Sequence, residues 1–266
     1  MAETKDLPES AAVFGKTAHQ LSETGGEPPE NYIWTNKTEV DAPLATDMPV
    51  IDVSLLASST DAELNALHSA LTKWGCFQVV AYLPFYIKRL PDEVRHLTTE
   101  FFHLPELEKQ RYTRQGNDIE GYSSCPPVSR TKWSDRLHLQ VAPEDGRKLK
   151  FWPQNPEPFQ SIAKTLSLTD EDCFARKMPT MCAQFNYYPP CSKNDQVIGL
   201  RPHTDGTGIT LLLQDSQVRG LQILKDNQWL SVPIIPQALF VLAGDQLEVC
   251  AYIYNVILKE KWITSD

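Results

Sequence analysis

A histidine and an aspartate two residues apart, in His203-Thr204-Asp205, are the strongest candidates for chemistry in this chain. On an extended strand, residues i and i+2 point to the same side, so both side chains could reach one metal ion. A face of two histidines and one carboxylate leaves positions open on Fe(II) for a cosubstrate and dioxygen. Alone, the motif is weak, because a chain with six histidines has odds of about one in three of carrying it by chance.

The surrounding residues form an ordered series. Asn186-Tyr187-Tyr188-Pro189-Pro190 stands upstream, and Gly199-Leu200-Arg201-Pro202 directly precedes the histidine. Further motifs follow downstream, namely Thr210–Asp215, Gly220-Leu221-Gln222, Trp229, Val232-Pro233 and Gly244-Asp245. Nearer the N-terminus stand WGCFQVV, FFHLP, DIEGY and KLKFWP. From about residue 48 to residue 248, this series resembles the plant 2-oxoglutarate- and Fe(II)-dependent dioxygenases. It is most similar to their specialised-metabolism branch, which includes flavonoid oxidases and alkaloid O-demethylases.

The resemblance implies a role for each matching residue. His203 and Asp205 would bind Fe(II), while Asn186 and Tyr188 would line the 2-oxoglutarate site, where Tyr188 would donate a hydrogen bond. No catalytic residue beyond the metal ligands is implied. Such enzymes use dioxygen and 2-oxoglutarate, with ascorbate as a reductant, to oxidise a small substrate. The expected reaction is the hydroxylation, O-demethylation or desaturation of a small plant metabolite.

The chain departs from the family at several points. The family has a second histidine further along, followed by Arg-x-Ser, which holds the distal carboxylate of 2-oxoglutarate. Here no histidine follows His203, and the only later arginine is Arg219, which has no serine two residues on. After Glu248 the likeness ends, so the tail resembles a replaced or truncated end. Two ligands hold a metal less tightly than three, and we therefore expect catalysis to be impaired or absent.

Two alternatives to the oxygenase stay open at this point. The first is a non-catalytic member of the same fold that binds a small molecule or a partner. The second is an oxidase that works without 2-oxoglutarate, and this is disfavoured because such relatives still need the second histidine. Singly, the motif residues also have plain structural explanations: Asp205 before Gly206 could be a turn residue.

The elements that must position these residues indicate an α+β protein. The resemblance implies a double-stranded β-helix, or jelly-roll, core that is incomplete, together with an N-terminal α/β region. We expect a flexible lead-in at 1–47, an N-terminal dioxygenase region at 48–160 and a truncated β-core at 178–266. The helix that backs this core in the family is missing after Phe159, so apolar sheet surface should be exposed. The missing last strands should leave an open sheet edge.

Periodicity gives the separate elements. Met48–Leu56 and Cys76–Val80 are predicted strands, and between them Thr60 and Glu63 form a capping box that opens a helix ending at Gly75. Pro91 is predicted in the first turn of a second helix. Short strands are expected at Cys182–Tyr187, Gly208–Leu213, Leu221–Leu224, Gln228–Val232, Leu239–Leu242 and Leu247–Tyr254. His96 and His103 are interpreted as surface or packing residues, and His138 as a half-buried strand residue.

Composition limits the other classes of function. The net charge of −9 disfavours a nucleic-acid partner, because phosphates require a basic face. The N-terminus has no signal-peptide pattern, and the apolar runs are too short to span a membrane. The six cysteines contain no CxxC pair and do not suggest disulfides. We expect a cytoplasmic monomer whose partners are a small-molecule substrate and O2.

Overall fold

The computed structural model describes residues 16–34, 42–56, 61–80, 85–124, 132–156, 159, 180–253 and 263–265. For 85–89, 251–253 and 263–265 it describes the backbone alone. The chain divides into two compact units. The first comprises Met1–Lys37 and His96–Gly199, and the second comprises Thr38–Arg95 and Leu200–Asp266.

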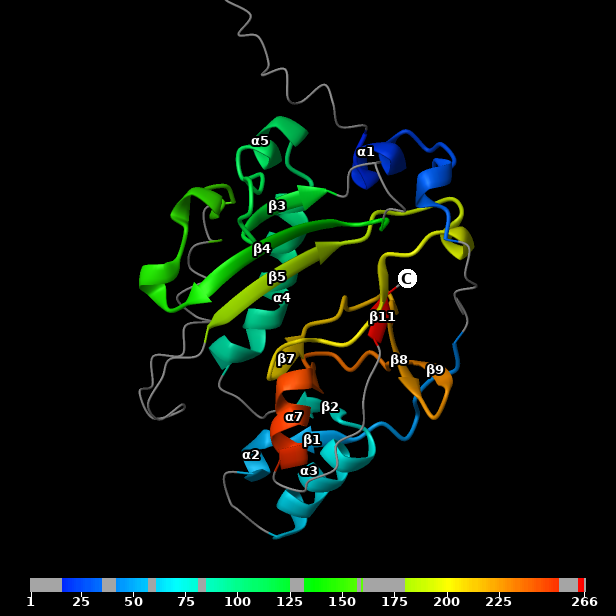
Figure 1. Ribbon diagram of the computed structural model, residues 1–266, viewed down its shortest axis with the longest axis vertical. Coiled ribbons are helices and arrows are strands. Elements are labelled where there is room, and N and C mark those ends of the chain that lie inside the picture. The colour runs from blue at the N-terminus through cyan, green and yellow to red at the C-terminus, as the bar shows by residue number, and fades with distance from the viewer. Residues whose placement is uncertain are drawn as a thin grey trace, which may run out of the picture. The chain divides into compact units, whose positions relative to one another are not determined.

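The first unit contains a three-stranded antiparallel sheet in the order β3-β4-β5 (Figure 1). Its strands are β3 (Gly121–Ser124), β4 (Asp135–Ala142) and β5 (Met181–Tyr187). Along β4, buried and half-buried residues alternate, because successive side chains on a strand point to opposite faces. Leu137 and Leu139 are buried on one face, while Arg136 and His138 belong to the other.

Helices and an aromatic core complete this unit. The helices are α1 (Ala18–Glu23), the end of α4 (Phe85–Phe102) and α5 (Glu106–Gln110), with single 3-10 turns η2 (Glu30–Tyr32), η3 (Glu144–Gly146), η4 (Leu149–Phe151) and η5 (Asn194–Gln196). The Phe101 ring contacts those of Phe102, Tyr122 and Phe159. Phe159 in turn contacts Phe185 of β5. This aromatic core therefore joins α4 to the sheet.

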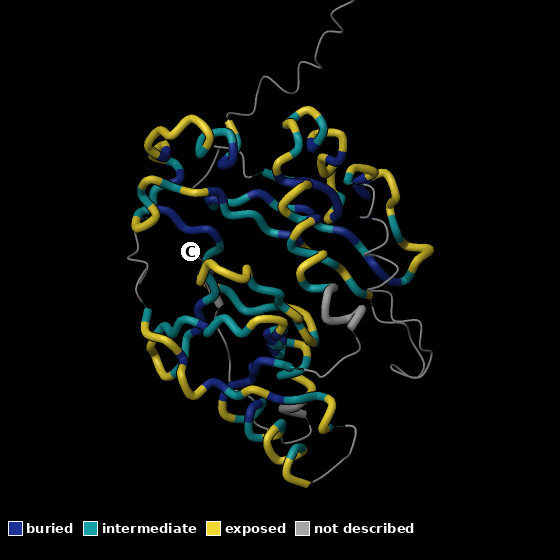
Figure 2. The backbone as a smooth tube through the Cα atoms, turned by 180° about the vertical axis from the view of Figure 1, so that it is seen from behind, coloured by how far each residue is buried: buried dark blue, intermediate teal, exposed yellow. Residues whose placement is uncertain are grey.

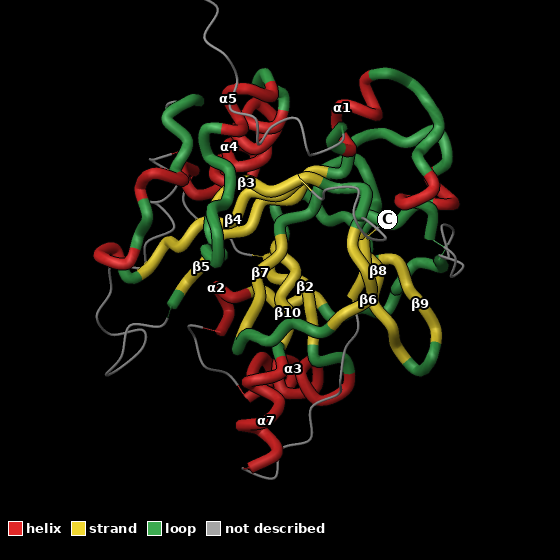
Figure 3. Tube along the Cα trace, turned by 45° about the horizontal axis from the view of Figure 1, so that its top comes forward, coloured by secondary structure: helices red, strands yellow, loops and turns green. Residues whose placement is uncertain are grey.

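The second unit contains two four-stranded sheets, in the orders β1-β2-β10-β7 and β6-β11-β8-β9. Figure 3 labels β2, β7 and β10 of the first sheet and β6, β8 and β9 of the second. All their strand pairs are antiparallel except β1 with β2. The strands are β1 (Val50–Asp52), β2 (Cys76–Val80), β6 (Leu200–His203), β7 (Ile209–Leu212), β8 (Leu221–Lys225), β9 (Gln228–Ser231), β10 (Leu239–Ala243) and β11 (Ile263–Ser265). The helices are α2 (Val53–Leu56), α3 (Asp61–Lys73) and α7 (Asp245–Ile253).

The core of the second unit has two parts. Phe240 and Leu242 of β10 pack with Trp74, Cys76 and residues of β8 and β9 in one cluster. On the alternate positions, Val241 packs with Ile51, Ala70 and Phe77, where α3 lies against β1 and β2. In Figure 2 the buried residues of this unit follow the strands. Both faces of β10 are thus covered, as its continuous apolar run requires.

Several predicted elements are confirmed. The strand Cys76–Val80 has the predicted bounds, and the predicted strands between residues 182 and 242 all form, with ends differing by at most one residue. The turn between β8 and β9 contains Asp226 and Asn227, both with positive φ, as a tight hairpin requires. His96 and His103 are exposed, and His138 is half-buried on β4.

Other predictions were wrong. Leu247–Tyr254 was predicted as a strand, but Asp245–Ile253 forms helix α7. The amides of Leu247 and Glu248 bond to the Gly244 carbonyl, and acidic residues in the first turn favour the helix. Pro91 lies inside α4 rather than in its first turn, because the helix begins at Phe85.

The lead-in is also more ordered than its composition indicated. Residues 16–34 contain α1, capped by Thr17 and Gln20, and Ala18, His19 and Tyr32 are buried. Tyr32 stacks edge-on against Trp133 at 5.1 Å between ring centroids. Part of the predicted lead-in thus forms a helix with buried side chains.

The C-terminal strand β11 is an internal strand of its sheet. β11 lies between β6 and β8, where Ile263 pairs with both His203 and Ile223. An edge does occur at β7, the last strand of the other sheet, where Ile209 and Leu211 are 57% and 62% exposed. Apolar sheet surface is thus exposed, as predicted.

Some predictions lie outside the described residues. These include the capping box at Thr60 and the predicted loss of the family's helix after Phe159. Of the six cysteines, Cys125 and Cys173 lie outside as well, and the four in the described part are free thiols. No helix in the described part of the chain is long and apolar enough to cross a membrane.

Candidate metal and cosubstrate site

The predicted metal ligands lie together at the end of β6. His203 is the last residue of the strand, and its Nε2 is 3.3 Å from Oδ1 of Asp205. Neighbouring ligands around an octahedral ion with bonds of about 2.1 Å are roughly 3 Å apart. His203 Nδ1 donates to the carbonyl oxygen of Arg201 at 2.8 Å, since a carbonyl can only accept. In the neutral ring the lone pair is therefore on Nε2, the nitrogen that faces Asp205.

The loop that carries Asp205 is held from the turn after β10. The amide of Asp245 donates to the carbonyl of Asp205 at 2.8 Å, and the amide of Gly244 donates to that of Gly208 at 2.9 Å. Thr204 Oγ1 donates to the Asp245 carboxylate at 3.1 Å. Gly244-Asp245 thus positions the loop of His203-Thr204-Asp205 through backbone and side-chain bonds. The sequence motif contained both residues, but nothing in it showed this contact.

Replacing Gly244 by alanine is expected to destabilise this loop. A Cβ at position 244 would lie 2.1 Å from the carbonyl oxygen of Thr207 and 2.8 Å from that of Asp205. Both are backbone atoms and cannot rotate away, so we expect a loss of about 1–3 kcal/mol in the free energy of unfolding. Urea denaturation measures it. Gly206→Ala is the matched control, because its Cβ would meet nothing within 4 Å, and an equal loss in both variants would contradict the prediction.

The pair is electrostatically suited to a cation. His203 holds the pKa of Asp205 below its usual value, because the protonated ring donates from Nε2 to the carboxylate. A hydrogen bond from Thr210 adds to this, while burial opposes both. Asp205 is therefore a carboxylate at neutral pH. The His203 side chain is 36% exposed and that of Asp205 is 17% exposed, so an ion can reach them from solvent.

Among the described residues, no third protein ligand is found beside this pair. Ile263 of β11 is the register partner of His203, and an aliphatic residue offers no metal-binding atom. Within the described ranges, no group of three or more His, Cys, Asp or Glu side chains could hold a metal ion. His203 and Asp205 therefore fit two positions of an iron site and not the complete set of three.

The predicted cosubstrate residues, Asn186 and Tyr188, belong to the first unit. Asn186 is on β5 opposite Arg136 of β4, and Tyr188 follows the end of the strand and is half-buried. Asn186 Oδ1 accepts a hydrogen bond from Gln184 Nε2 at 3.1 Å. Asn186 and Gln184 share one face of the sheet, because they are two residues apart on a strand.

Sequence reasoning missed a buried polar cluster in the same unit. Lys109 is 1% exposed, and its ammonium contacts Glu106, His19 and the Phe102 carbonyl. Nearby, Tyr122 donates to the buried Asp135 at 3.0 Å. Burial raises the pKa of Asp135, partly offset by the Ser124 hydrogen bond and by Lys109. Sequence could not reveal this cluster, since Glu106 and Lys109 read as an ordinary surface pair on a short helix.

Two protein-family models match the chain. The model described as the 2OG-Fe(II) oxygenase superfamily matches residues 179–254. The model described as non-haem dioxygenase in morphine synthesis N-terminal matches residues 48–155. The first match includes Asn186, Tyr188, His203 and Asp205, and ends before β11.

Curated plant proteins are similar over most of the chain. Protein SRG1 of Arabidopsis thaliana is 35% identical over 83% of this chain and 70% of its own length. The oxoglutarate-dependent flavonoid 7-O-demethylase 1 of Ocimum basilicum is 30% identical over 94% of this chain and 73% of its own length. Codeine O-demethylase of Papaver somniferum is 33% identical over 84% of this chain and 68% of its own length.

Solved structures share the fold. The crystal structure of JOX2 in complex with 2OG, Fe and JA has a TM-score of 0.77 and 28% identity, covering 94% of this chain and 78% of that one. The dioxygenase for auxin oxidation in rice has a TM-score of 0.62 and 19% identity, covering 82% of this chain and 78% of that one. At this identity the likeness supports the fold alone. The predicted jelly-roll architecture is thereby confirmed.

Proposed function

Since this chain belongs to the plant 2-oxoglutarate- and Fe(II)-dependent oxygenase family, we propose that it oxidises a small plant metabolite at an impaired iron site. Members of this family are enzymes that use Fe(II) and 2-oxoglutarate. In this proposal His203 and Asp205 bind the metal, and Asn186 and Tyr188 bind the cosubstrate. The bound metal and cosubstrate would together activate dioxygen.

One observation carries this proposal, namely the fixed geometry of His203 and Asp205 at the end of β6. The Nδ1 bond to Arg201 sets the ring orientation, and the Asp245 amide anchors the carboxylate-bearing residue by its carbonyl. A site that is positioned by its supporting bonds loses little entropy when an ion binds. The neighbouring strand β11 supports the proposed impairment of metal binding, because Ile263, the register partner of His203, offers no metal-binding atom.

The substrate class follows from the relatives only in general terms. The names of the similar proteins mention a flavonoid and codeine, which share no scaffold. We therefore propose a small metabolite without specifying its skeleton. The reaction would be an oxidation such as hydroxylation or demethylation, with succinate formed from 2-oxoglutarate.

The test is metal binding by the full chain, measured by calorimetric titration with Mn(II) under anaerobic conditions. We expect weak binding by the natural chain and a further loss of about tenfold or more in His203→Ala and Asp205→Ala. His96→Ala, a change at an exposed histidine of α4, is the matched control and should bind as the natural chain does. Equal binding by all four proteins would overturn the ligand assignment.

Succinate formation tests the activity. With Fe(II), 2-oxoglutarate and ascorbate, we expect slow, iron-dependent production of succinate that His203→Ala abolishes. Rapid, fully coupled turnover of the natural chain would contradict the proposed impairment. Complete absence of either Mn(II) binding or 2-oxoglutarate binding would contradict the proposed function itself.

A further inference from the structure

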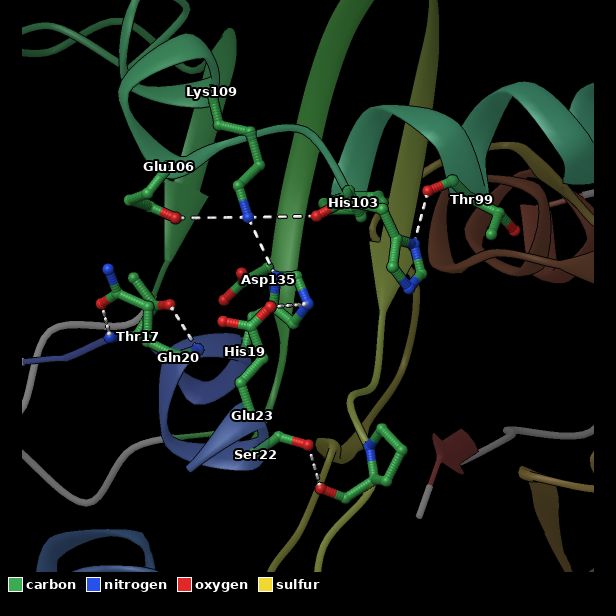
Figure 4. Close-up of polar contacts among 12 residues, drawn as sticks. Thr17, His19, Gln20, Ser22, Glu23, Thr99, His103, Glu106, Lys109 and Asp135 are labelled. Atoms are coloured by element: carbon green, nitrogen blue, oxygen red, sulfur yellow. Dashed lines mark hydrogen bonds and ion pairs between the residues drawn. The ribbon is translucent and has the colours of Figure 1, made fainter. Parts of the chain in front are cut away.

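Lys109 is a buried cation at the centre of a polar cluster in the first unit (Figure 4). Its Nζ lies 3.2 Å from Glu106 Oε2, donates to the Phe102 carbonyl at 3.1 Å and donates to His19 Nδ1 at 3.1 Å. The ammonium also lies 5.7 Å from the centroid of the Tyr122 ring. The proposed metal and cosubstrate residues include none of these groups, so the cluster requires its own explanation.

His19 enters this cluster from α1 and is 7% exposed. An ammonium can only donate, so Nδ1 accepts and the neutral ring carries its proton on Nε2, 3.8 Å from Glu23. Burial lowers the pKa of His19, and the charge of Lys109 lowers it further. His103 acts in the same direction, whereas Glu23 and Glu106 act oppositely. A second cation beside Lys109 is thus disfavoured.

The same imidazole is one of three rings that hold Tyr187, the last residue of β5. Tyr187 stacks on Phe102 with centroids 5.3 Å apart and an interplanar angle of 14°. His19 and His103 contact it edge-on at 5.2 and 5.6 Å. Tyr187 is therefore fixed between the end of α4 and the N-terminal helix α1.

Tyr187 stands between Asn186 and Tyr188 in the sequence. Successive residues of a strand point to opposite faces, so a fixed Tyr187 directs Asn186 to the other face. Tyr187 is also the last residue of β5, so fixing it fixes the backbone from which Tyr188 continues. The segment that follows is anchored as well. Ser22 of α1 donates to the Pro190 carbonyl at 2.7 Å, and Trp133 Nε1 donates to that of Pro189 at 2.8 Å.

We propose that His19 is a positioning residue, which with Lys109 fixes Tyr187 and so presents Asn186 and Tyr188 to 2-oxoglutarate. The inference rests on the proposed function, because it takes the cosubstrate role of those two residues from there. According to this proposal, α1 contributes to 2-oxoglutarate binding because it carries His19. It connects residues at the start of the chain to the strand that carries the cosubstrate side chains.

Three variants of the full chain test this. His19→Leu keeps an apolar group against Tyr187 but removes the acceptor for Lys109. His19→Asn keeps an acceptor at about the place of Nδ1 and cannot titrate near neutral pH. His96→Leu is the matched control, because it makes the same change at an exposed histidine of the same unit.

The measurement is 2-oxoglutarate affinity by calorimetry in the presence of Mn(II). At pH 7.5 we expect about tenfold weaker binding in His19→Leu, since a hydrogen bond to a charged group is lost. His19→Asn and His96→Leu should bind like the natural chain. Circular dichroism verifies that each variant is folded, and hydrogen exchange of the peptide covering 184–190 should accelerate in His19→Leu alone.

The pH dependence of 2-oxoglutarate affinity distinguishes a positioning role of His19 from a purely structural one. As pH falls below the ordinary histidine pKa of 6.5 toward the lowered pKa of His19, protonation places a second cation beside Lys109. The natural chain should then lose affinity relative to His19→Asn, since that variant lacks this titration. The charged and titratable neighbours Lys109, Glu23, Glu106, His103, Asp135, Tyr122 and Tyr187 are the same in both proteins.

The outcomes are distinct. If folded His19→Leu binds 2-oxoglutarate as tightly as the natural chain, the positioning role is overturned and the proposed function stands. If the natural chain binds no 2-oxoglutarate at all, both the proposed function and the positioning role of His19 are overturned. Parallel pH profiles for the natural chain and His19→Asn would also overturn the positioning role.

Discussion

Replacing Ile263 by histidine is expected to raise the affinity of this chain for Mn(II) by about tenfold or more. Ile263 is the register partner of His203 across the antiparallel pair of β11 and β6. Directly opposed positions in such a pair have Cβ atoms about 4.5–5.5 Å apart. A histidine at 263 would thus begin within reach of an ion held by His203 and Asp205. It would supply the second imidazole of a two-histidine, one-carboxylate face.

The measurement is the same anaerobic calorimetric titration, because it needs no substrate and no turnover. Thr264→His is the matched control, since the neighbouring position on a strand faces the other side of the sheet. The gain should also vanish in Ile263→His combined with His203→Ala, where the other imidazole is absent. Equal gains from positions 263 and 264 would show nonspecific binding by an added histidine and contradict the prediction.

Removing the buried ammonium with Lys109→Met is expected to cost the first unit about 3–5 kcal/mol of its free energy of unfolding. Methionine fills a similar volume, so the loss comes from charge and hydrogen bonding rather than from a cavity. Glu106 and the Phe102 carbonyl lose a donor, and His19 loses the partner of its Nδ1. Partners left buried without their counter-charge account for most of such a cost.

Urea denaturation followed by tryptophan fluorescence measures this loss, and Trp133 and Trp152 both lie in the affected unit. Lys150→Met is the matched control, because Lys150 is exposed and its ion pair with Asp118 spans 3.5 Å. Exposed pairs of this kind contribute at most about 1 kcal/mol. A similar loss in both variants would contradict the special role of Lys109.

The effect of Lys109→Met should also depend on pH. Burial raises the pKa of Asp135, and Lys109 is among the groups that lower it, so the variant should raise it further. The folded variant then holds a proton that the unfolded chain releases. The stability that Asp135 contributes is therefore fully present below the ordinary aspartate pKa of 3.8 and is lost as pH rises through the raised value. The difference between the natural chain and the variant should accordingly be smaller in acid.

The helix α7 shows where local patterns were insufficient. Leu247–Tyr254 has the apolar content of a strand, but Asp245 is tied to Asp205, and among the described strands none pairs with this segment. Strand formation depends on a neighbouring strand, whereas a helix satisfies its own backbone. Where a predicted strand had a partner in the sheet, as at Cys76–Val80, the prediction was confirmed.

The sequence alone determined the family and the proximity of His203 and Asp205. Ordered motifs report ancestry, and a separation of two residues on a strand places side chains on one face whatever the rest of the fold does. It also showed that no histidine follows His203.

Only the tertiary structure decided what surrounds these residues. It placed Ile263 opposite His203, tied the Asp205 loop to Gly244-Asp245 and buried Lys109 against His19, ninety residues away in the chain. The physical reason is that contacts between distant segments depend on sheet register and packing, which no local pattern contains. The register of β11 against β6 and the ring contacts of Tyr187 are both of this kind.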